Sequence, residues 1–308
     1  MDNHLSVNQQ ILEMTTIVNC QSAKYNYNSQ GSGFFYTELA KEPTGPINEE
    51  KQLGWYQVMG TWLVTNRHVV FPRIDDPITG QKKETVPDSF TFNFKEIVGD
   101  EIKWILVTLN QRDLLKRTML HSDDSVDVVA IKVDDLATAL MVSKAHPNMI
   151  SIGKVTDRDL PSASPLTIEA TSDVVICSYP HGFYDRVNKY PIVKSGIIAS
   201  SWGKPFNGTR TFLVDANLFP GSSGGLVLSK PTDIARINGK VMHSDFKHYV
   251  FLGVYSGQYN YVETNLDGTT KVESYGLGIV WYSDLVHEIV NGSRLRRSEE
   301  HTSELQSR

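Results

Sequence analysis

Short runs of β-branched and aromatic residues, separated by turn signals, recur along the whole of this 308-residue chain. Such runs are typical of strands, because these side chains pack well on a pleated, half-buried surface. Asn207-Gly208, Asn238-Gly239 and Asp267-Gly268 predict hairpin turns. The predicted strands are Ile11 to Asn19, Gly33 to Thr37, Trp55 to Val64, Phe90 to Phe94, Ile102 to Leu109, Asp127 to Val133, Asp173 to Ser178, Ile192 to Ser201, Arg210 to Asp215, Gly225 to Leu228, His248 to Tyr255 and Leu277 to Trp281. Their number and spacing predict an all-β barrel or sandwich.

One helix is predicted, near the end of the chain. Ser283 is a good N-cap, and the residues after it carry the apolar stripe of an amphipathic helix: Leu285, Val286, Ile289 and Val290. Residues 136–172 are poorer in strand signal, so we expect them to connect two β-units, residues 1–135 and 173–293. The polar stretches 38–52, 72–88 and 230–247 are predicted loop insertions. Residues 297–308 have almost no core-forming side chains, so we expect an artefactual or disordered tail there.

The composition excludes several functional classes. The net charge of −5 gives no reason to expect nucleic acid or an anionic membrane as a partner. The histidines and the two cysteines, Cys20 and Cys177, form no metal-ligand spacing, so we expect neither a metal nor another cofactor. So few cysteines fit a reducing compartment. With no signal-peptide pattern at the start and no long apolar window, we expect a cytoplasmic protein without a membrane span. The sequence carries no signal for an oligomeric state.

Three residues with complementary chemistry stand beside strand-like stretches. His68 ends the run Thr65-Asn66-Arg67-His68, Asp127 directly precedes Val128-Val129-Ala130-Ile131, and Ser223 lies within Gly221-Ser222-Ser223-Gly224-Gly225. A serine hydroxyl is a poor nucleophile until a base takes its proton, and that base needs an acceptor on its other nitrogen. His68 and Asp127 suit these roles. A lone histidine is usually structural, and Asp123 and Asp124 fit a solvated turn, so the prediction depends on all three motifs together.

The glycines around Ser223 have a chemical reason of their own. A tetrahedral intermediate needs two backbone N–H groups that converge on one point, which requires a tight turn with unusual dihedral angles. Gly221, Gly224 and Gly225 permit such a turn, so the N–H groups of Gly221 and Ser223 are predicted to form an oxyanion hole. Gly31-Ser32-Gly33 could suggest a phosphate-binding loop, but no helix pattern follows it, and the start of a strand is favoured.

With these motifs in view, the chain resembles the chymotrypsin-fold serine proteases, most closely the bacterial HtrA/DegP-like branch without its PDZ domains. The resemblance rests on six motifs in order: Gly31 to Phe35, Trp62 to Val70, Asp127 to Val133, Val193 to Ile198, Asp215 to Gly225 and Gly276 to Val280. It implies two six-stranded antiparallel β-barrels with a His-Asp-Ser triad between them. It also implies a serine endopeptidase that hydrolyses peptide bonds of protein or peptide substrates through an acyl-enzyme intermediate.

The resemblance also implies a substrate site. The S1 pocket would be lined by Asn217, Leu218, Ser256, Gly257, Gln258 and Gly276. None of these residues is acidic, so we expect an uncharged P1 residue rather than Arg or Lys. The strand Tyr255 to Gln258 would pair with the backbone of an extended substrate.

One departure from the family pattern keeps other functions open. Ser222 stands where relatives carry Asn or Asp, so we expect no activation through an ion pair with a newly cut N-terminus. This departure permits an alternative function, a catalytically silent protease-fold module that binds proteins. An esterase of the α/β-hydrolase type is a weaker alternative. Its Gly-x-Ser-x-Gly pattern is present, but it needs alternating helices and strands and a histidine that follows the serine.

Overall fold

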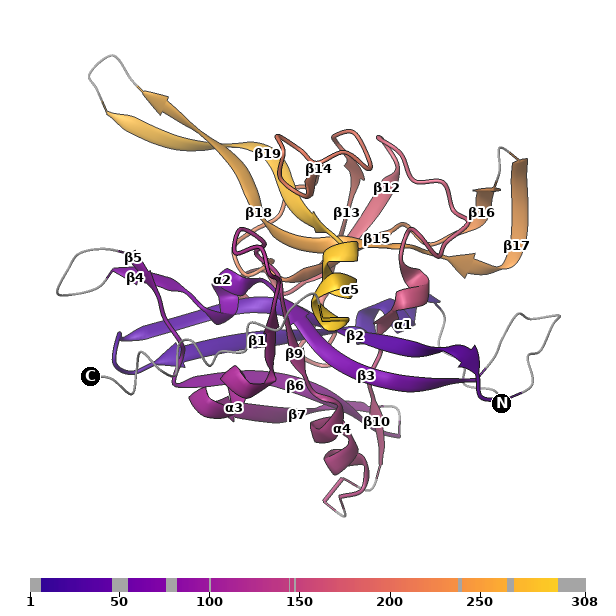
Figure 1. The fold of residues 1–308 in the computed structure, drawn as a ribbon, viewed down its shortest axis with the longest axis horizontal. Coiled ribbons are helices and arrows are strands. Elements are labelled where there is room, and N and C mark those ends of the chain that lie inside the picture. The colour runs from indigo at the N-terminus through magenta and orange to yellow at the C-terminus, as the bar shows by residue number, and fades with distance from the viewer. Residues whose placement is uncertain are drawn as a thin grey trace.

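The computed structural model describes residues 7–45, 55–75, 82–99, 101–143, 145–146, 148–237, 240–264 and 269–292. Strands dominate these residues, and the C-terminal helix is present (Figure 1), which confirms the predicted all-β, chymotrypsin-like fold. The helices are α1 (Val7–Glu13), α2 (Arg67–Val70), α3 (Gln111–Arg117), α4 (Asp134–Met141) and α5 (Asp284–Val290), with 3-10 turns at Asp157–Asp159 and Pro180–Gly182.

The first unit is built on a nine-stranded sheet, where the resemblance implied a six-stranded barrel. Its main path runs β10-β6-β1-β2-β3-β9-β8, with β7 paired to β6 and β11 paired in parallel to β2. The strands are β1 (Thr15–Ser22), β2 (Tyr27–Pro43), β3 (Tyr56–Thr65), β6 (Ser89–Val98), β7 (Glu101–Asn110), β8 (Thr118–Leu120), β9 (Val129–Lys132), β10 (Met149–Ser151) and β11 (Val155–Thr156). A short hairpin of β4 (Arg73–Asp75) and β5 (Lys82–Glu84) follows α2.

The second unit is a closed six-stranded antiparallel barrel in the order β12-β13-β14-β19-β18-β15. Its strands are β12 (Asp173–Ser178), β13 (Ile192–Ile198), β14 (Thr211–Asp215), β15 (Gly225–Ser229), β18 (Phe251–Thr264) and β19 (Thr270–Tyr282). The hairpin of β16 (Thr232–Ile237) and β17 (Lys240–His248) leaves the barrel on one side, and the long β18–β19 hairpin projects on the other (Figure 1).

Several predicted elements differ in extent from the observed ones. The strand expected from Ile11 begins as helix α1, because a short apolar run does not distinguish a helix from a strand. Residues 230–247 are not a loop insertion but mostly the β16–β17 hairpin. The strand expected from His248 starts at Phe251 and continues to Thr264. The turn signals Asn238-Gly239 and Asp267-Gly268 lie outside the described residues, although the strands that flank each of them pair as hairpins.

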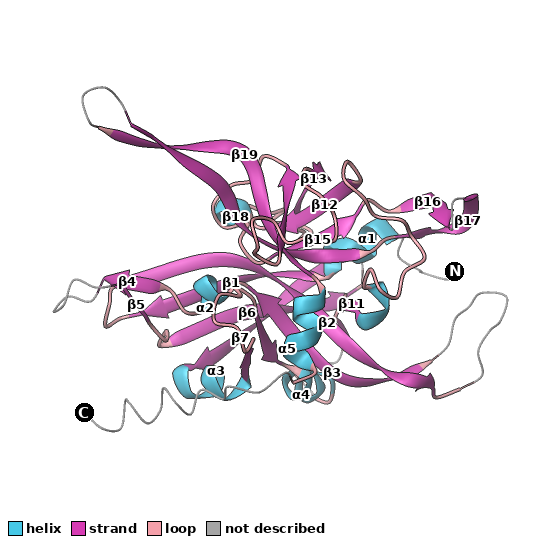
Figure 2. Cartoon of the chain, turned by 45° about the horizontal axis from the view of Figure 1, so that its top comes forward, coloured by secondary structure: helices cyan, strands magenta, loops and turns pink. Residues whose placement is uncertain are grey.

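A shared hydrophobic core joins the two units through α5. Leu285, Val286, Ile289 and Val290 of this helix are buried with Tyr36 and Trp62 of the first unit and Phe251 and Trp281 of the second. Both views place α5 between the units (Figures 1 and 2). The C-terminal helix therefore contributes to the relative position of the two sheets, whose facing ends carry the predicted catalytic residues.

An ionic cluster also connects α5 to both units. Arg210, just before β14, donates to Glu288 of α5 at 2.5 and 2.8 Å and to Asp284 at 2.8 Å, while His121, just after β8, contacts Glu288 at 3.0 Å. The Arg210 guanidinium, with a smaller contribution from His121, lowers the pKa of Glu288 from its ordinary value of 4.5 to about 2. Since the ionised carboxylate is favoured in the folded state, the cluster stabilises the fold above about pH 4.5.

Glu288→Gln is therefore expected to lower the free energy of unfolding at pH 7 by about 1–2 kcal/mol. The pKa shift alone would give more, but the Glu288 side chain is 37% exposed and solvent screens the pair. As the pH falls from 4.5 toward 2, the Glu288 carboxylate becomes protonated in the unfolded chain before it does in the folded one, so the difference between the two proteins shrinks. Urea denaturation at pH 7, 5, 4 and 3 measures this, with the exposed Glu101→Gln as control. A difference that is constant with pH would contradict the assignment.

Both cysteine thiols are unpaired and buried, Cys20 in β1 and Cys177 in β12. Burial raises the pKa of each thiol to about 12. Both cysteines therefore act as small core residues here, and the structure has no disulfide between them. Among the described residues, no helix is long and apolar enough to cross a membrane.

Candidate active site

The structure brings His68 and Asp127 together at the ends of two paired strands. His68 lies in α2, directly after β3, and Asp127 lies two residues before β9; the pairing of Thr65 with Val129 holds these ends side by side. Asp127 contacts His68 twice. Its Oδ2 lies 2.7 Å from the imidazole Nδ1, and its Oδ1 accepts the backbone N–H of His68 at 2.8 Å. The two contacts fix the orientation of the imidazole and leave Nε2 as the nitrogen that faces away from the carboxylate.

Ser256 of β18 is the third partner of this pair. Its hydroxyl donates to Asp127 Oδ2 at 2.6 Å. The register of β18 against β19 shifts here, since Tyr255 pairs with Val280 and Gly257 with Ile279, so Ser256 is an extra residue in a β-bulge. Bulges turn side chains away from the regular strand pattern and are frequent beside active sites. The bulge explains how a strand of the second unit reaches a carboxylate of the first.

Ser223 lies in a tight loop between Phe219 and β15. Gly221 has a φ of +89° and Gly224 a φ of +82°, the left-handed region that favours glycine. At Gly221 a Cβ atom would lie 2.7 Å from the backbone nitrogen of His181, and at Gly224 it would lie 2.0 Å from the carbonyl oxygen of Ser32. Both glycines are thus required by conformation and by space, as the sequence pattern predicted for this turn.

The hydroxyl of Ser223 is not bonded to His68 in this structure. It donates instead to the carbonyl oxygen of Ser256 at 2.8 Å. Within the described residues, the backbone N–H groups of Gly221 and Ser223 have no hydrogen-bond partner, whereas the N–H of Gly224 donates both to Asn66 and to Tyr255. The loop therefore presents two free donors beside a hydroxyl, and one change of the χ1 rotamer redirects that hydroxyl.

Two buried residues that the sequence did not single out hold the loop in place. Asn66 Oδ1 accepts the N–H of Gly224 at 2.6 Å, and its Nδ2 donates to the carbonyl of Asp127 at 2.7 Å. Asn66 thereby connects the serine loop to the aspartate. Ser32 of β2 accepts the N–H of Tyr179 and donates to the carbonyl of Gly221, both at 2.8 Å. Their positions within two of the motifs were visible in the sequence, but their side-chain partners were not.

Ser222, the departure from the family pattern, is fully buried. Its hydroxyl oxygen accepts a hydrogen bond from the hydroxyl of Ser178 in β12 at 3.2 Å. A neutral serine pair thus occupies the place next to the nucleophile. No charged partner is needed to keep this side chain in the interior.

The predicted substrate residues surround the loop but face different ways. Leu218 is buried in the core of the second unit, so its backbone rather than its side chain is available, and its carbonyl accepts Gln258 Nε2 at 2.5 Å. Asn217 is exposed, and Ser256, Gly257 and Gln258 are partly exposed. Gly276 is exposed, with a φ of +75°, at the second register shift of β18 against β19. The side chain of Gln258 therefore connects two of the residues that the resemblance assigns to the S1 pocket, Gln258 itself and Leu218.

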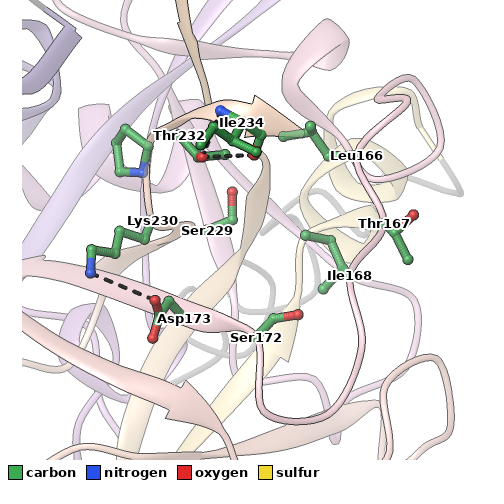
Figure 3. Close-up of a pocket in the computed structure, with 10 residues that line it drawn as sticks. Leu166, Thr167, Ile168, Ser172, Asp173, Ser229, Lys230, Thr232 and Ile234 are labelled. Carbon is green, nitrogen blue, oxygen red and sulfur yellow. Dashed lines mark hydrogen bonds and ion pairs between the residues drawn. The ribbon is translucent and has the colours of Figure 1, made fainter. Parts of the chain in front are cut away.

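Two of the cavities that the described residues line lie near the surface. One of about 630 Å³ lies beside His68 and Asp127 on the side of the β4–β5 hairpin, and its lining includes Tyr27, Phe71 and Glu84. The other, of about 350 Å³, lies between residues 166–173 and 229–234 of the second unit (Figure 3). Lys230 and Asp173 form an ion pair of 3.6 Å at its rim. It contains none of the predicted catalytic residues.

A family model described as a trypsin-like peptidase domain matches residues 31–232, about two thirds of the chain. No curated protein matches the sequence significantly. Among solved structures, the Rv3671c protease of M. tuberculosis in its active form is 17% identical with a TM-score of 0.40, over 92% of this chain and 82% of that one. Protease Anisep from Arthrobacter nicotinovorans is 11% identical with a TM-score of 0.43, over 91% and 94%. The catalytically active tobacco etch virus protease complexed with product is 9% identical with a TM-score of 0.43, over 96% and 85%.

Proposed function

Because the chain belongs to the family of trypsin-like peptidase domains and is a serine endopeptidase, we propose that it cleaves peptide bonds with a triad of Ser223, His68 and Asp127. The observation that carries the proposal is the double contact between Asp127 and His68, at 2.7 and 2.8 Å. A carboxylate that accepts the Nδ1 proton keeps the proton off Nε2, which makes Nε2 available as a base.

In the proposed reaction, Ser223 attacks the substrate carbonyl carbon while His68 Nε2 takes the hydroxyl proton. The free N–H groups of Gly221 and Ser223 stabilise the resulting oxyanion. His68 then gives the proton to the leaving amine as the peptide C–N bond breaks, which leaves an acyl-enzyme. Water, deprotonated by His68, hydrolyses this ester and regenerates Ser223.

The bond from Ser223 to the Ser256 carbonyl suggests how substrate starts the reaction. The backbone N–H of the P1 residue is the natural donor for a carbonyl on this edge of β18. When it binds there, it competes with the Ser223 hydroxyl, which then turns to His68 by one rotamer change. The silent binding module loses support from this arrangement, since the oriented imidazole and the two unused N–H donors have no role in mere binding.

Specificity is proposed to be for an uncharged P1 residue. No residue assigned to the S1 pocket carries a negative charge that could neutralise a P1 cation: Asn217, Leu218, Ser256, Gly257, Gln258 and Gly276. The Gln258 side chain, bonded to the Leu218 carbonyl, forms part of the wall on which the P1 residue would pack. We also propose that the enzyme works in the cytoplasm. The two buried, unpaired thiols in different units support a reducing compartment.

Digestion of an unfolded protein tests this function. We expect wild type to cut reduced, carboxymethylated casein, with kcat/KM rising as the pH is raised from 5 to 8, because the base must be a neutral imidazole. Mass spectrometry of the products identifies the new termini and hence the P1 residue. Ser223→Ala is the control. A rate that is flat over this pH range, or that survives in the control, would contradict the proposed mechanism.

A further inference from the structure

Strand β18 continues far beyond the barrel to which it belongs. Of its 14 residues, those from Phe251 to Tyr255 lie along β15 on one edge, and Gly253 to Tyr255 also pair with β19 on the other. From Ser256 to Thr264 it pairs only with β19, and within the described residues no strand occupies its other edge. Together with residues 270–276 of β19, this segment forms what we call the β18–β19 arm, which projects at the upper left of Figure 1.

The free edge begins at the proposed nucleophile. The last β15–β18 pair is Gly225 with Tyr255, and Ser223 lies two residues before it. The edge that β15 leaves is the edge onto which the Ser256 carbonyl points, since that carbonyl accepts the Ser223 hydroxyl at 2.8 Å. A peptide whose scissile bond lies at Ser223 would therefore take over the place of β15 and run along the arm.

The register along this edge follows from the pattern of β18. Beyond the bulge at Ser256, the second register shift lies on β19, where Tyr275 and Gly276 are the extra residues, so β18 itself stays regular to Thr264. Backbone groups of a strand alternate between its two edges. Since the Ser256 carbonyl faces the free edge, every second residue after it does so too: Gln258, Asn260, Val262 and Thr264.

This edge also lacks the features that normally protect exposed strands. Natural edges are blunted by lysine, proline or bulges, because unpaired N–H and C=O groups otherwise recruit another chain. From Gly257 to Thr264 there is no lysine, proline or bulge on β18, and Glu263 is the one charged residue. Asn260 to Thr264 are all exposed. An edge that is open over this length, and continuous with the catalytic site, is suited to receive a strand.

We propose that the β18–β19 arm is an extended substrate site, which binds the polypeptide on the N-terminal side of the scissile bond as an added antiparallel strand up to about P9. With P1 opposite Ser256, the residues P5, P7 and P9 lie opposite Asn260, Val262 and Thr264. The inference rests on the proposed function and deepens it, because it makes the substrate class long extended segments, such as unfolded regions or flexible loops, rather than short peptides.

Recognition along the arm is mainly through the backbone. One face of the arm is filled by tyrosines that contact one another, with ring centroids 5.8 Å apart for Tyr259 and Tyr275 and 4.6 Å apart for Tyr261 and Tyr275. Lys271 is ion-paired with Glu273 of the same strand. The arm thus offers little free charge, so we expect selection by length and extended conformation more than by sequence, with apolar side chains favoured next to the tyrosine face.

A length series tests the proposal. Acetylated peptides would carry one site that wild type cuts in casein, with the primed side constant and the other side ending at P4, P6, P8 or P10. The added backbone hydrogen bonds are expected to raise kcat/KM by about 10- to 100-fold between P4 and P10, with a plateau after P9. N-methylation at P7 is expected to lower the rate about 3- to 10-fold, while N-methylation at P6 or P8 changes it less than about 2-fold, since only alternate N–H groups face the arm.

A variant in which residues 261–273 are replaced by an Asn-Gly turn is expected to lose the length dependence but to cut the P4 peptide as wild type does. If this variant keeps the dependence, or if P6 and P7 methylation act alike, the proposal is wrong. A flat series together with a wild-type dimer that the variant lacks would also overturn it, and would assign the edge to a second copy of the chain.

A binding experiment distinguishes a failure of the proposed triad from a failure of the extended substrate site. Binding of fluorescent peptides to Ser223→Ala requires no turnover, and its affinity is expected to follow the same length series. Length-dependent binding to Ser223→Ala, with no hydrolysis by wild type, would contradict the proposed triad and keep the arm as a binding site. Hydrolysis that is indifferent to length would leave the triad intact and contradict the arm.

Discussion

Asp127→Asn is expected to lower kcat/KM by about 10⁴-fold with little change in the fold. Asp127 Oδ1 accepts the backbone N–H of His68, and Oδ2 accepts from Ser256 and contacts His68 Nδ1. An asparagine keeps its carbonyl oxygen toward the backbone N–H, so its NH₂ group points at Nδ1. The imidazole must then carry its proton on Nε2, where it cannot accept the proton of Ser223.

The matched control is Asp123→Asn, four residues earlier in the same loop. Asp123 accepts the N–H of Ser125 at 2.9 Å and is not a partner of His68. Its replacement is expected to change kcat/KM less than about 3-fold. Steady-state kinetics on the same peptide compare the two variants, and circular dichroism checks their folds. Equal losses in both, or a loss below about 100-fold for Asp127→Asn, would contradict the role given to Asp127.

Gly221→Ala has the second largest expected effect, a loss of about 10²- to 10³-fold in kcat. The new Cβ would lie 2.7 and 2.9 Å from backbone atoms of His181 and Tyr179, and alanine is strained at a φ of +89°. Backbone atoms of this kind yield little, so the peptide of residue 221 must rotate. Its N–H then no longer converges with the N–H of Ser223, and one oxyanion donor is lost.

Gly203→Ala separates this effect from backbone strain in general. Gly203 also has a positive φ, +75°, but a Cβ there meets no atom within 4 Å. We expect Gly203→Ala to lower the melting temperature slightly and to leave kcat unchanged, whereas Gly221→Ala lowers both. If Gly221→Ala keeps wild-type kcat, its N–H is not an oxyanion donor.

The three proposed catalytic residues could be predicted from the sequence because each lies next to a recognisable local pattern. The apolar, strand-like runs before Thr65 and after Asp127 predict strands that end beside these residues, and the glycines around Ser223 predict the tight turn that is observed. What connects them could not be predicted. Asn66, Ser32 and the hydroxyl of Ser256 act through residues up to 189 positions away, and single-residue patterns do not reveal such partners.

The extent of the strands was the least predictable part of the fold. Residues 256–264 carry several polar side chains and pair only with β19 at one edge, so no burial pattern marks them as a strand. Helix α1 was missed for the opposite reason. Ile11 is buried in the core that both units share, and a short apolar stretch fits a helix or a strand equally well. The loop signals at 230–247 reflect polar composition, which a projecting hairpin shares with a loop.

Fluorophosphonate labelling shows whether the folded chain holds an activated Ser223. Purified wild type and Ser223→Ala would be treated alike after both are shown to have native circular dichroism. We expect labelling of wild type on Ser223, established by mass spectrometry, with labelling that increases from pH 5 to 8, and none in Ser223→Ala. Folded wild type that stays unlabelled, or a label on another residue that persists in Ser223→Ala, would contradict it.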